Sequence, residues 1–220
     1  MIKSQQCFLL MLPLVMLSQS MEDLKELKKI KIAIYKSWQA NMDEGWSRWM
    51  LEQFDFDLDT LHNVDVQTRD LTQYSAIIVP SQSPNGILNG HRKGRMPENL
   101  TGGVGAEGVA ALDAYAKAGG SVIFYDAASD FAIKEFDLPV KNVTAGIKPN
   151  DFFIPGSLVR TDVDTKNRLG FGMMDQVAAS FNRSRAFKIN DGASGITEIA
   201  KYAGEDILMS GWALGEENHL

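Results

Sequence analysis

Apolar residues occur in short runs along the first 130 residues, and each run has the length of a buried β-strand. The runs at 30–35, 76–79 and 121–125 consist mainly of isoleucine, valine and aromatic residues. Parallel strands that are covered on both faces have this continuous apolar character. A further strand is predicted at 56–61, where Phe56, Leu58 and Leu61 occur.

Apolar residues at helical spacing predict helices between these strands. The first helix, at about 42–54, has an apolar face that we interpret mainly as core; this face consists of Trp46, Trp49, Met50 and Phe54. The second helix is predicted at 105–118. Strands that alternate with helices through short links predict a doubly wound α/β fold, in which helices cover both faces of a parallel sheet.

Beyond Phe136 the pattern is less regular. Strands are predicted at 158–162 and 196–200, and a final buried strand at 207–212. No covering helix is predicted after that strand, which fits either the edge of the sheet or a fold truncated at its C-terminus. We therefore expect one α/β domain over 30–217, followed by a short tail at 218–220.

The first twenty residues have the three parts of a secretory signal peptide. Lys3 precedes an apolar run at 7–17, and Ser18 and Ser20 supply small residues for cleavage. Alternatives are an apolar end that belongs to the fold, or a true start at Met21. The run is too short to span a bilayer comfortably. We expect a signal peptide at 1–20, a charged segment at 21–29, a secreted or periplasmic protein, and no stable membrane span after processing.

Charge and cysteine content exclude several classes of function. The net charge of −6 argues against nucleic acid as a partner. The single cysteine, Cys7, lies in the predicted signal peptide, so a processed chain would contain no disulfide, thiolate metal site or cysteine nucleophile. The three histidines, His62, His91 and His219, lack metal-ligand spacing. No metal and no cofactor are expected.

Ligands of open parallel sheets bind at the carboxyl ends of the strands. Three loops of this chain are predicted to meet there: 36–44, 80–103 and 126–131. They supply a candidate ligand crevice formed by Asn41, Glu44, His91, Arg92, Asp126, Ser129 and Asp130.

Each of these candidates also has a structural interpretation. Asn41 with Glu44 three residues later resembles a helix N-cap, and Asp43 and Glu44 suit a helix N-terminus better than a catalytic or metal-binding pair. His91 and Arg92, with Lys93 and Arg95, form a basic cluster that suits an anion, although solvated charge runs are more common.

Two further motifs lie beside helix starts. Ser129 follows a strand where a nucleophile elbow would occur, but it would need His62 or His91 as its base; Asp126 and Asp130 more naturally cap the following helix. The glycines at 102–105 resemble a phosphate-binding loop only weakly, and close backbone packing explains them better.

Several long segments resemble one protein family: YKSWQANMDEGWSRWMLEQF, ILNG, TGGVGAEG, ASDFAI, FFIPGSLVRTDVD and ILMSGWALGEE. They resemble the C-terminal domain of large secreted zinc carboxypeptidase-family proteins, which is similar to class I glutamine amidotransferases. The resemblance covers about 29–217 and implies a flavodoxin-like α/β fold. It also implies a partner, namely a zinc peptidase module.

The chemistry of that family is not implied for this chain. The zinc motif HxxE is absent, since His62 is followed by Asn-Val-Asp and His91 by Arg-Lys-Gly. The cysteine of amidotransferases is replaced by the sequence YDAASDF at the elbow. We expect a non-catalytic accessory or binding domain that recognises a peptidase module or a small ligand. The alternatives are a hydrolase that acts through Ser129 or through Asp43 and Glu44, and a truncated gene remnant.

Overall fold

The computed structural model describes residues 30–220. The expectations for the signal peptide, Cys7 and the segment 21–29 lie outside the described residues. The chain divides into two compact units, one that ends at Phe131 and one that comprises Ala132–Leu220. The segment predicted as one domain, 30–217, therefore includes parts of both units.

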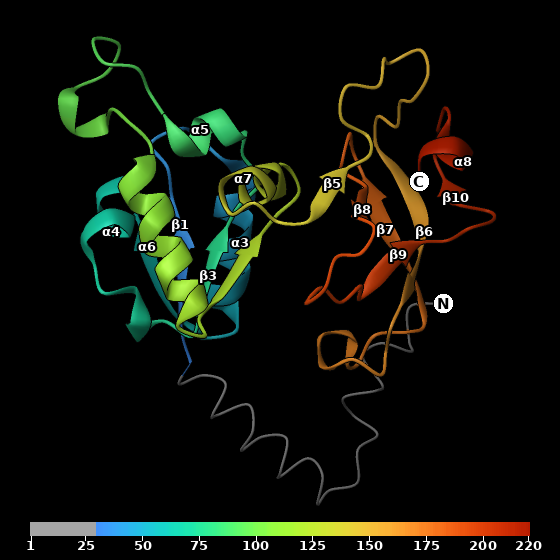
Figure 1. The fold of residues 1–220 in the computed structure, drawn as a ribbon, viewed down its shortest axis with the longest axis horizontal. Coiled ribbons are helices and arrows are strands. Elements are labelled where there is room, and N and C mark those ends of the chain that lie inside the picture. The colour runs from blue at the N-terminus through green and yellow to red at the C-terminus, as the bar shows by residue number, and fades with distance from the viewer. Residues whose placement is uncertain (1–29) are drawn as a thin grey trace, which may run out of the picture. The chain divides into compact units, whose positions relative to one another are not determined.

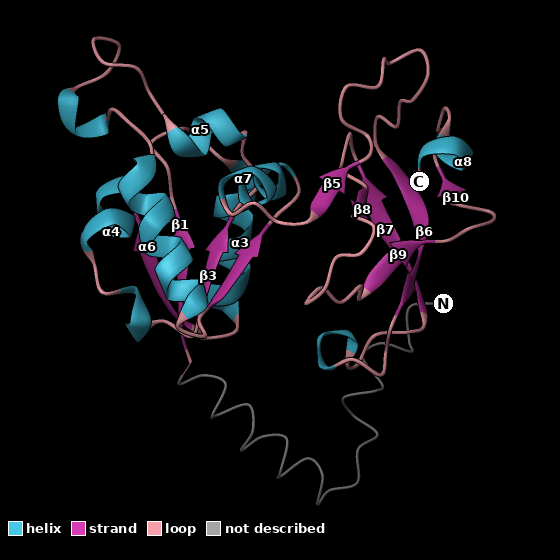
Figure 2. Cartoon of the chain, viewed as in Figure 1, coloured by secondary structure: helices cyan, strands magenta, loops and turns pink. Residues whose placement is uncertain are grey.

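The first unit contains a parallel sheet with the strand order β2-β1-β3-β4 (Figures 1 and 2). Its strands are β1 (Lys31–Tyr35), β2 (Asp57–Leu61), β3 (Ala76–Val79) and β4 (Ser121–Phe124). This order is that of the first four strands of a flavodoxin-like fold. All four predicted strands of this region and the α/β class are confirmed.

Helices cover both faces of this sheet. They are α3 (Met42–Gln53), α4 (Asn63–Thr68), α5 (Pro84–Leu88), α6 (Gly105–Lys117) and α7 (Ala127–Glu135), with 3₁₀ turns η1 (Leu71–Gln73) and η2 (Glu98–Leu100). Leu51 of α3 packs against the face that presents Ile34 and Ile78. Ile78 is paired with Ile123, so the next residue, Phe124, points to the opposite face. There it contacts Phe131 of α7, with 6.1 Å between the ring centroids.

The prediction that the tryptophans of α3 belong to the core is wrong. Trp46 is 67% exposed and Trp49 is 54% exposed, and Met50 and Phe54 are also exposed. Glu44, which is only 5% exposed, is the buried residue of this helix. Helical periodicity identified the apolar face correctly, but it does not determine the rotation of the helix about its axis, and α3 turns this face away from the sheet.

The second unit is built from antiparallel strands. Its central strand, β6 (Ser157–Val163), pairs with β7 (Gln176–Phe181), β9 (Ala200–Tyr202) and β10 (Leu208–Ser210). A separate pair joins β5 (Val140–Asn142) to β8 (Phe187–Ile189), and η3 (Arg168–Gly170) and α8 (Glu216–His219) complete the unit. Its core consists of Ile154, Val159, Phe181 and Ile207.

The predictions for this second unit are confirmed only in part. The strand at 158–162 lies inside β6, whereas the strand predicted at 196–200 is displaced to β9 and overlaps it at one residue. The segment 207–212 contributes β10, but Met209 and Trp212 are exposed, so the prediction of a buried strand is wrong. Of the segment 207–212, Ile207 belongs to the core of the second unit, whereas the residues of β10 that follow it are half-buried or exposed.

Candidate functional site

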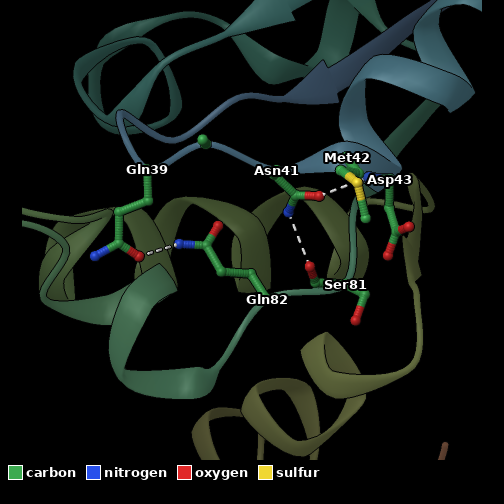
Figure 3. A pocket seen from close by; sticks show the side chains of 7 residues that line it. Gln39, Asn41, Met42, Asp43, Ser81 and Gln82 are labelled. Atoms are coloured by element: carbon green, nitrogen blue, oxygen red, sulfur yellow. Dashed lines mark hydrogen bonds between the residues drawn. The ribbon is translucent and has the colours of Figure 1, made fainter. Parts of the chain in front are cut away.

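An open pocket of about 400 Å³ lies at the carboxyl ends of β1 and β3 (Figure 3). Residues from the β1–α3 loop, the start of α3 and the segment after β3 line it: Gln39, Ala40, Asn41, Met42, Asp43, Ser81 and Gln82. Sequence reasoning predicted a ligand site at this edge of the sheet and included Asn41 in it. Gln39, Ser81 and Gln82 were not among the predicted site residues, because isolated polar loop residues have no recognisable motif.

Side-chain hydrogen bonds join the two segments that form the pocket. The Nδ2 of Asn41 donates to the carbonyl oxygen of Ser81 over 2.8 Å, and the Nε2 of Gln82 donates to the Oε1 of Gln39 over 2.8 Å (Figure 3). Asn41 also caps α3, since its Oδ1 accepts from the amides of Asp43 and Glu44. The predicted N-cap is therefore confirmed, and the same side chain fixes the start of the helix to the pocket wall.

The acidic pair of the α3 N-terminus is divided between two environments. Asp43 is exposed and lines the pocket. Glu44 is buried, and its Oε1 accepts from the Nε of Arg48 over 2.8 Å. Arg48 also contacts Glu52 at 3.3 Å, so these three side chains form a row of ion pairs along the helix. Of this acidic pair, Asp43 is thus the residue that lines the pocket.

The elbow after β4 is occupied by Asp126. This residue has a φ of 38°, a left-handed conformation that aspartate tolerates better than most residues. Its Oδ2 accepts from the hydroxyl of Ser81 over 3.1 Å, and the amide of Ala127 donates to the same Ser81 oxygen over 3.3 Å. The carboxylate of Asp126 therefore contacts Ser81, which lines the pocket, but Asp126 itself is not a lining residue.

Ser129 and the histidines make backbone contacts in this structure. The hydroxyl of Ser129 donates to the carbonyl of Phe124 over 3.3 Å. His62 has its Nδ1 2.7 Å from the carbonyl oxygen of Lys36, and its ring stacks on Trp38 at 3.9 Å. His91 has its Nε2 3.2 Å from the carbonyl oxygen of Trp38. Within the described residues, neither histidine is hydrogen-bonded to Ser129.

The basic cluster, Gly102 and Gly103 belong to the segment 80–103, which contains α5 and η2, whereas Gly105 begins α6. Arg92, Lys93 and Arg95 are exposed, and none of them lines the pocket. Two glycines of this segment have close backbone neighbours: a Cβ at Gly103 would overlap the carbonyl oxygen of Ile87, and one at Gly90 that of Gly102. A Cβ at Gly102 would meet open space. The interpretation of the glycines at 102–105 as close-packing residues is therefore confirmed for Gly103 but is wrong for Gly102, and a Cβ at Gly105 would meet only side chains. Asp130 lies in the first turn of α7 and is half-buried.

Residues 30–220 contain neither a cluster of metal-ligating side chains nor a membrane-spanning helix. No group of three His, Cys, Asp or Glu side chains in this range is arranged to hold a metal ion. No helix in the same range has the length and apolar character needed to cross a membrane.

Comparisons with known proteins give fold-level likenesses. No protein-family model and no curated protein matches this sequence. The solved structure of a putative GMP synthase subunit from Thermoplasma acidophilum is similar, with 12% identity, 79% of this chain and 73% of that chain covered, and a TM-score of 0.49. A glutamine amidotransferase from Thermotoga maritima is similar at 11% identity, with 74% and 64% covered and a TM-score of 0.46.

The assignment to the α/β class rests on the strand order of the first unit. This chain spans less than two thirds of the amidotransferase from Thermotoga maritima. At identities this low, nothing about activity follows from either likeness.

Proposed function

We propose that this chain is a non-catalytic, amidotransferase-like binding domain that holds a small polar ligand in the pocket between Asn41 and Gln82. The observation that supports this function is the arrangement of polar groups around that pocket. The hydroxyl of Ser129 and both histidine rings contact backbone carbonyls, whereas amide and carboxylate groups face the pocket. Such a site suits recognition better than nucleophilic catalysis.

The pocket groups indicate the chemistry of the ligand. Asp43 supplies an exposed carboxylate, which favours a cation. In the hydrogen bond between the side chains of Gln82 and Gln39, Gln82 uses its NH₂ group and Gln39 uses its amide oxygen. Within the described residues, the NH₂ group of Gln39 and the amide oxygen of Gln82 therefore have no protein partner. These groups suit a small amine that also has an amide or hydroxyl group. Asp43 lies at a helix N-terminus, which weakens the electrostatic preference for a cation.

We predict that Asp43→Asn weakens the binding of small primary amines about tenfold, because the variant loses a charge-assisted hydrogen bond of about 1.4 kcal/mol. Saturation-transfer NMR with amino-acid amides and amino sugars identifies a binder, and titration calorimetry measures its affinity. Glu98→Gln, an exposed carboxylate in η2, is the control and should leave the affinity unchanged. Equal affinities for wild type and Asp43→Asn would contradict the proposed ligand chemistry.

The alternative function, a hydrolase that acts through Ser129 or through Asp43 and Glu44, predicts measurable turnover, whereas the proposed binding function predicts none. We expect no turnover of peptides, esters or glutamine above the background of a buffer blank. Any weak turnover in the preparation should persist unchanged in Ser129→Ala and Glu44→Gln. Turnover that either substitution abolishes would contradict the binding function, provided that the variants retain the wild-type circular dichroism spectrum.

We also propose that this chain associates with a zinc carboxypeptidase-type protein and that it is secreted or periplasmic. These two proposals are supported by the resemblance of the sequence segments and by the apolar run at 7–17. A reading frame for a zinc peptidase immediately upstream, and co-purification of its product with this chain, would support the association. Thermal melting of residues 21–220 tests the remaining alternative, because a gene remnant would lack a cooperative transition.

A further inference from the structure

Helix α3 has its apolar face on the outside. Met42, Trp46 and Trp49 share one side of the helix, whereas the buried Glu44 lies on the opposite side with Leu51, which packs against the sheet. Exposed Met50 and Phe54 widen this surface toward the helix end. We call these five exposed residues the α3 stripe. A helix whose polar face is buried and whose aromatic face is exposed is the reverse of an ordinary surface helix.

The composition of the α3 stripe is that of an interface centre. Trp46 and Trp49 pack edge to face, with 5.9 Å between their ring centroids and 88° between their planes. This pairing holds two large, rigid rings together on the surface, and the exposed Asp43 lies one turn from Trp46 toward the helix start. Trp is enriched among the residues that dominate binding energies, and charged residues are depleted at interface centres.

We infer that the α3 stripe is the interface of a two-fold homodimer, in which α3 packs antiparallel against α3 of a second copy. The two tryptophans are equally far from the midpoint of the helix, which runs from Met42 to Gln53. An antiparallel pairing about this midpoint places Trp46 of one copy opposite Trp49 of the other. Such self-complementarity is what a two-fold interface requires, and two-fold dimers are the commonest oligomers.

The exposed area of the α3 stripe is adequate for a dimer. Trp46, Trp49 and Phe54 expose 67%, 54% and 66% of their surfaces, and Met42 and Met50 add further apolar area. With side-chain areas of about 150–250 Å² per aromatic residue, the stripe supplies about 600 Å² per copy. Two copies bury about 1,200 Å², which is at the lower end of specific interfaces. The net charge of −6 on each copy opposes association, so added salt should favour the dimer.

Light scattering coupled to size-exclusion chromatography tests this interface on the full chain. The wild type should have twice the chain mass of 24.3 kDa at about 100 µM. The double variant Trp46→Gln/Trp49→Gln should be monomeric, with at least a tenfold weaker association and an unchanged melting temperature. Phe171→Gln, which replaces an 87% exposed aromatic residue of the second unit, is the matched control and should remain dimeric.

Three outcomes would overturn the inference. One is a wild type that is monomeric over the whole concentration range, and another is a dimer that persists in Trp46→Gln/Trp49→Gln. The third is a monomer that sediments with phosphatidylcholine vesicles through the same tryptophans, which would identify a lipid surface as the occupant. If the double variant fails to fold, Phe54→Gln tests the same face at the helix end. Met42 belongs both to the α3 stripe and to the pocket lining, but the tryptophan variants leave Met42 and Asp43 unchanged, so the Asp43→Asn titration tests amine binding separately.

Discussion

Gly90→Ala is expected to lower the free energy of unfolding by about 4 kcal/mol, the largest loss that we predict for a single substitution. A Cβ at this position would overlap the carbonyl oxygen of Gly102, which belongs to the backbone and cannot move aside as a flexible side chain can. Relief of such an overlap costs about 3 kcal/mol, and the φ of 55° adds about 1 kcal/mol for any residue with a Cβ.

Gly94→Ala is the matched control for this prediction. Gly94 lies in the same segment and has a φ of 82°, but a Cβ there would meet open space. The control should therefore lose only about 1 kcal/mol, which is the conformational part of the effect. Urea denaturation with an unchanged m-value measures both losses. If the two variants lose the same stability, the close approach of Gly90 to Gly102 does not contribute to the fold.

The role of a glycine is only partly visible in the sequence. Close backbone packing at 102–105 was preferred over a phosphate-binding loop, and the contact at Gly103 agrees with that interpretation. The sequence did not indicate which backbone atoms approach, because Ile87 and Gly103 are brought together by the course of the segment after β3. A pairwise contact of this kind depends on tertiary structure rather than on a local pattern.

Local hydrogen bonding explains why some features were predictable. The N-cap at Asn41 involves residues within three positions of one another, so the sequence contains all of its participants. The parallel strands were predictable for a similar reason, since their apolar runs are continuous. The left-handed conformation at Asp126 was missed, because the sequence Asp-Ala-Ala after a strand does not indicate which residue forms the elbow.

The orientation of α3 illustrates a different limit. Hydrophobic periodicity establishes that Trp46 and Trp49 share a face, but not whether that face meets the sheet. Glu44 faces inward because Arg48 neutralises it there, an interaction between residues one turn apart. The second unit was harder still, since β6 pairs not only with β7, the next strand along the chain, but also with β9 and β10, which are distant in sequence. Such pairing is determined by the packing of Val159 and Phe181 rather than by local propensity.

Asn63→Leu is expected to lower the free energy of unfolding by about 3 kcal/mol, because Asn63 is the buried link between β1 and the segment 80–103. Its Oδ1 accepts from the hydroxyl of Tyr35 over 2.7 Å, and its Nδ2 donates to the carbonyl oxygen of Gly102 over 2.7 Å. Leucine has a similar volume but leaves both groups without this partner, and each unsatisfied group costs about 1–3 kcal/mol. Burial raises the pKa of Tyr35, so its hydroxyl stays a donor at neutral pH.

A double-mutant cycle with Tyr35→Phe separates this link from the effects of packing. Tyr35→Phe removes the hydroxyl and should cost about 1 kcal/mol, while the double variant should lose about 1 kcal/mol less than the sum of the single losses. Asn85→Leu, at an exposed position of α5, should change the stability by less than about 0.5 kcal/mol. Strict additivity of Tyr35→Phe and Asn63→Leu would contradict a hydrogen bond between these side chains. It would also mean that the segment beside the pocket is held to β1 by contacts other than Asn63.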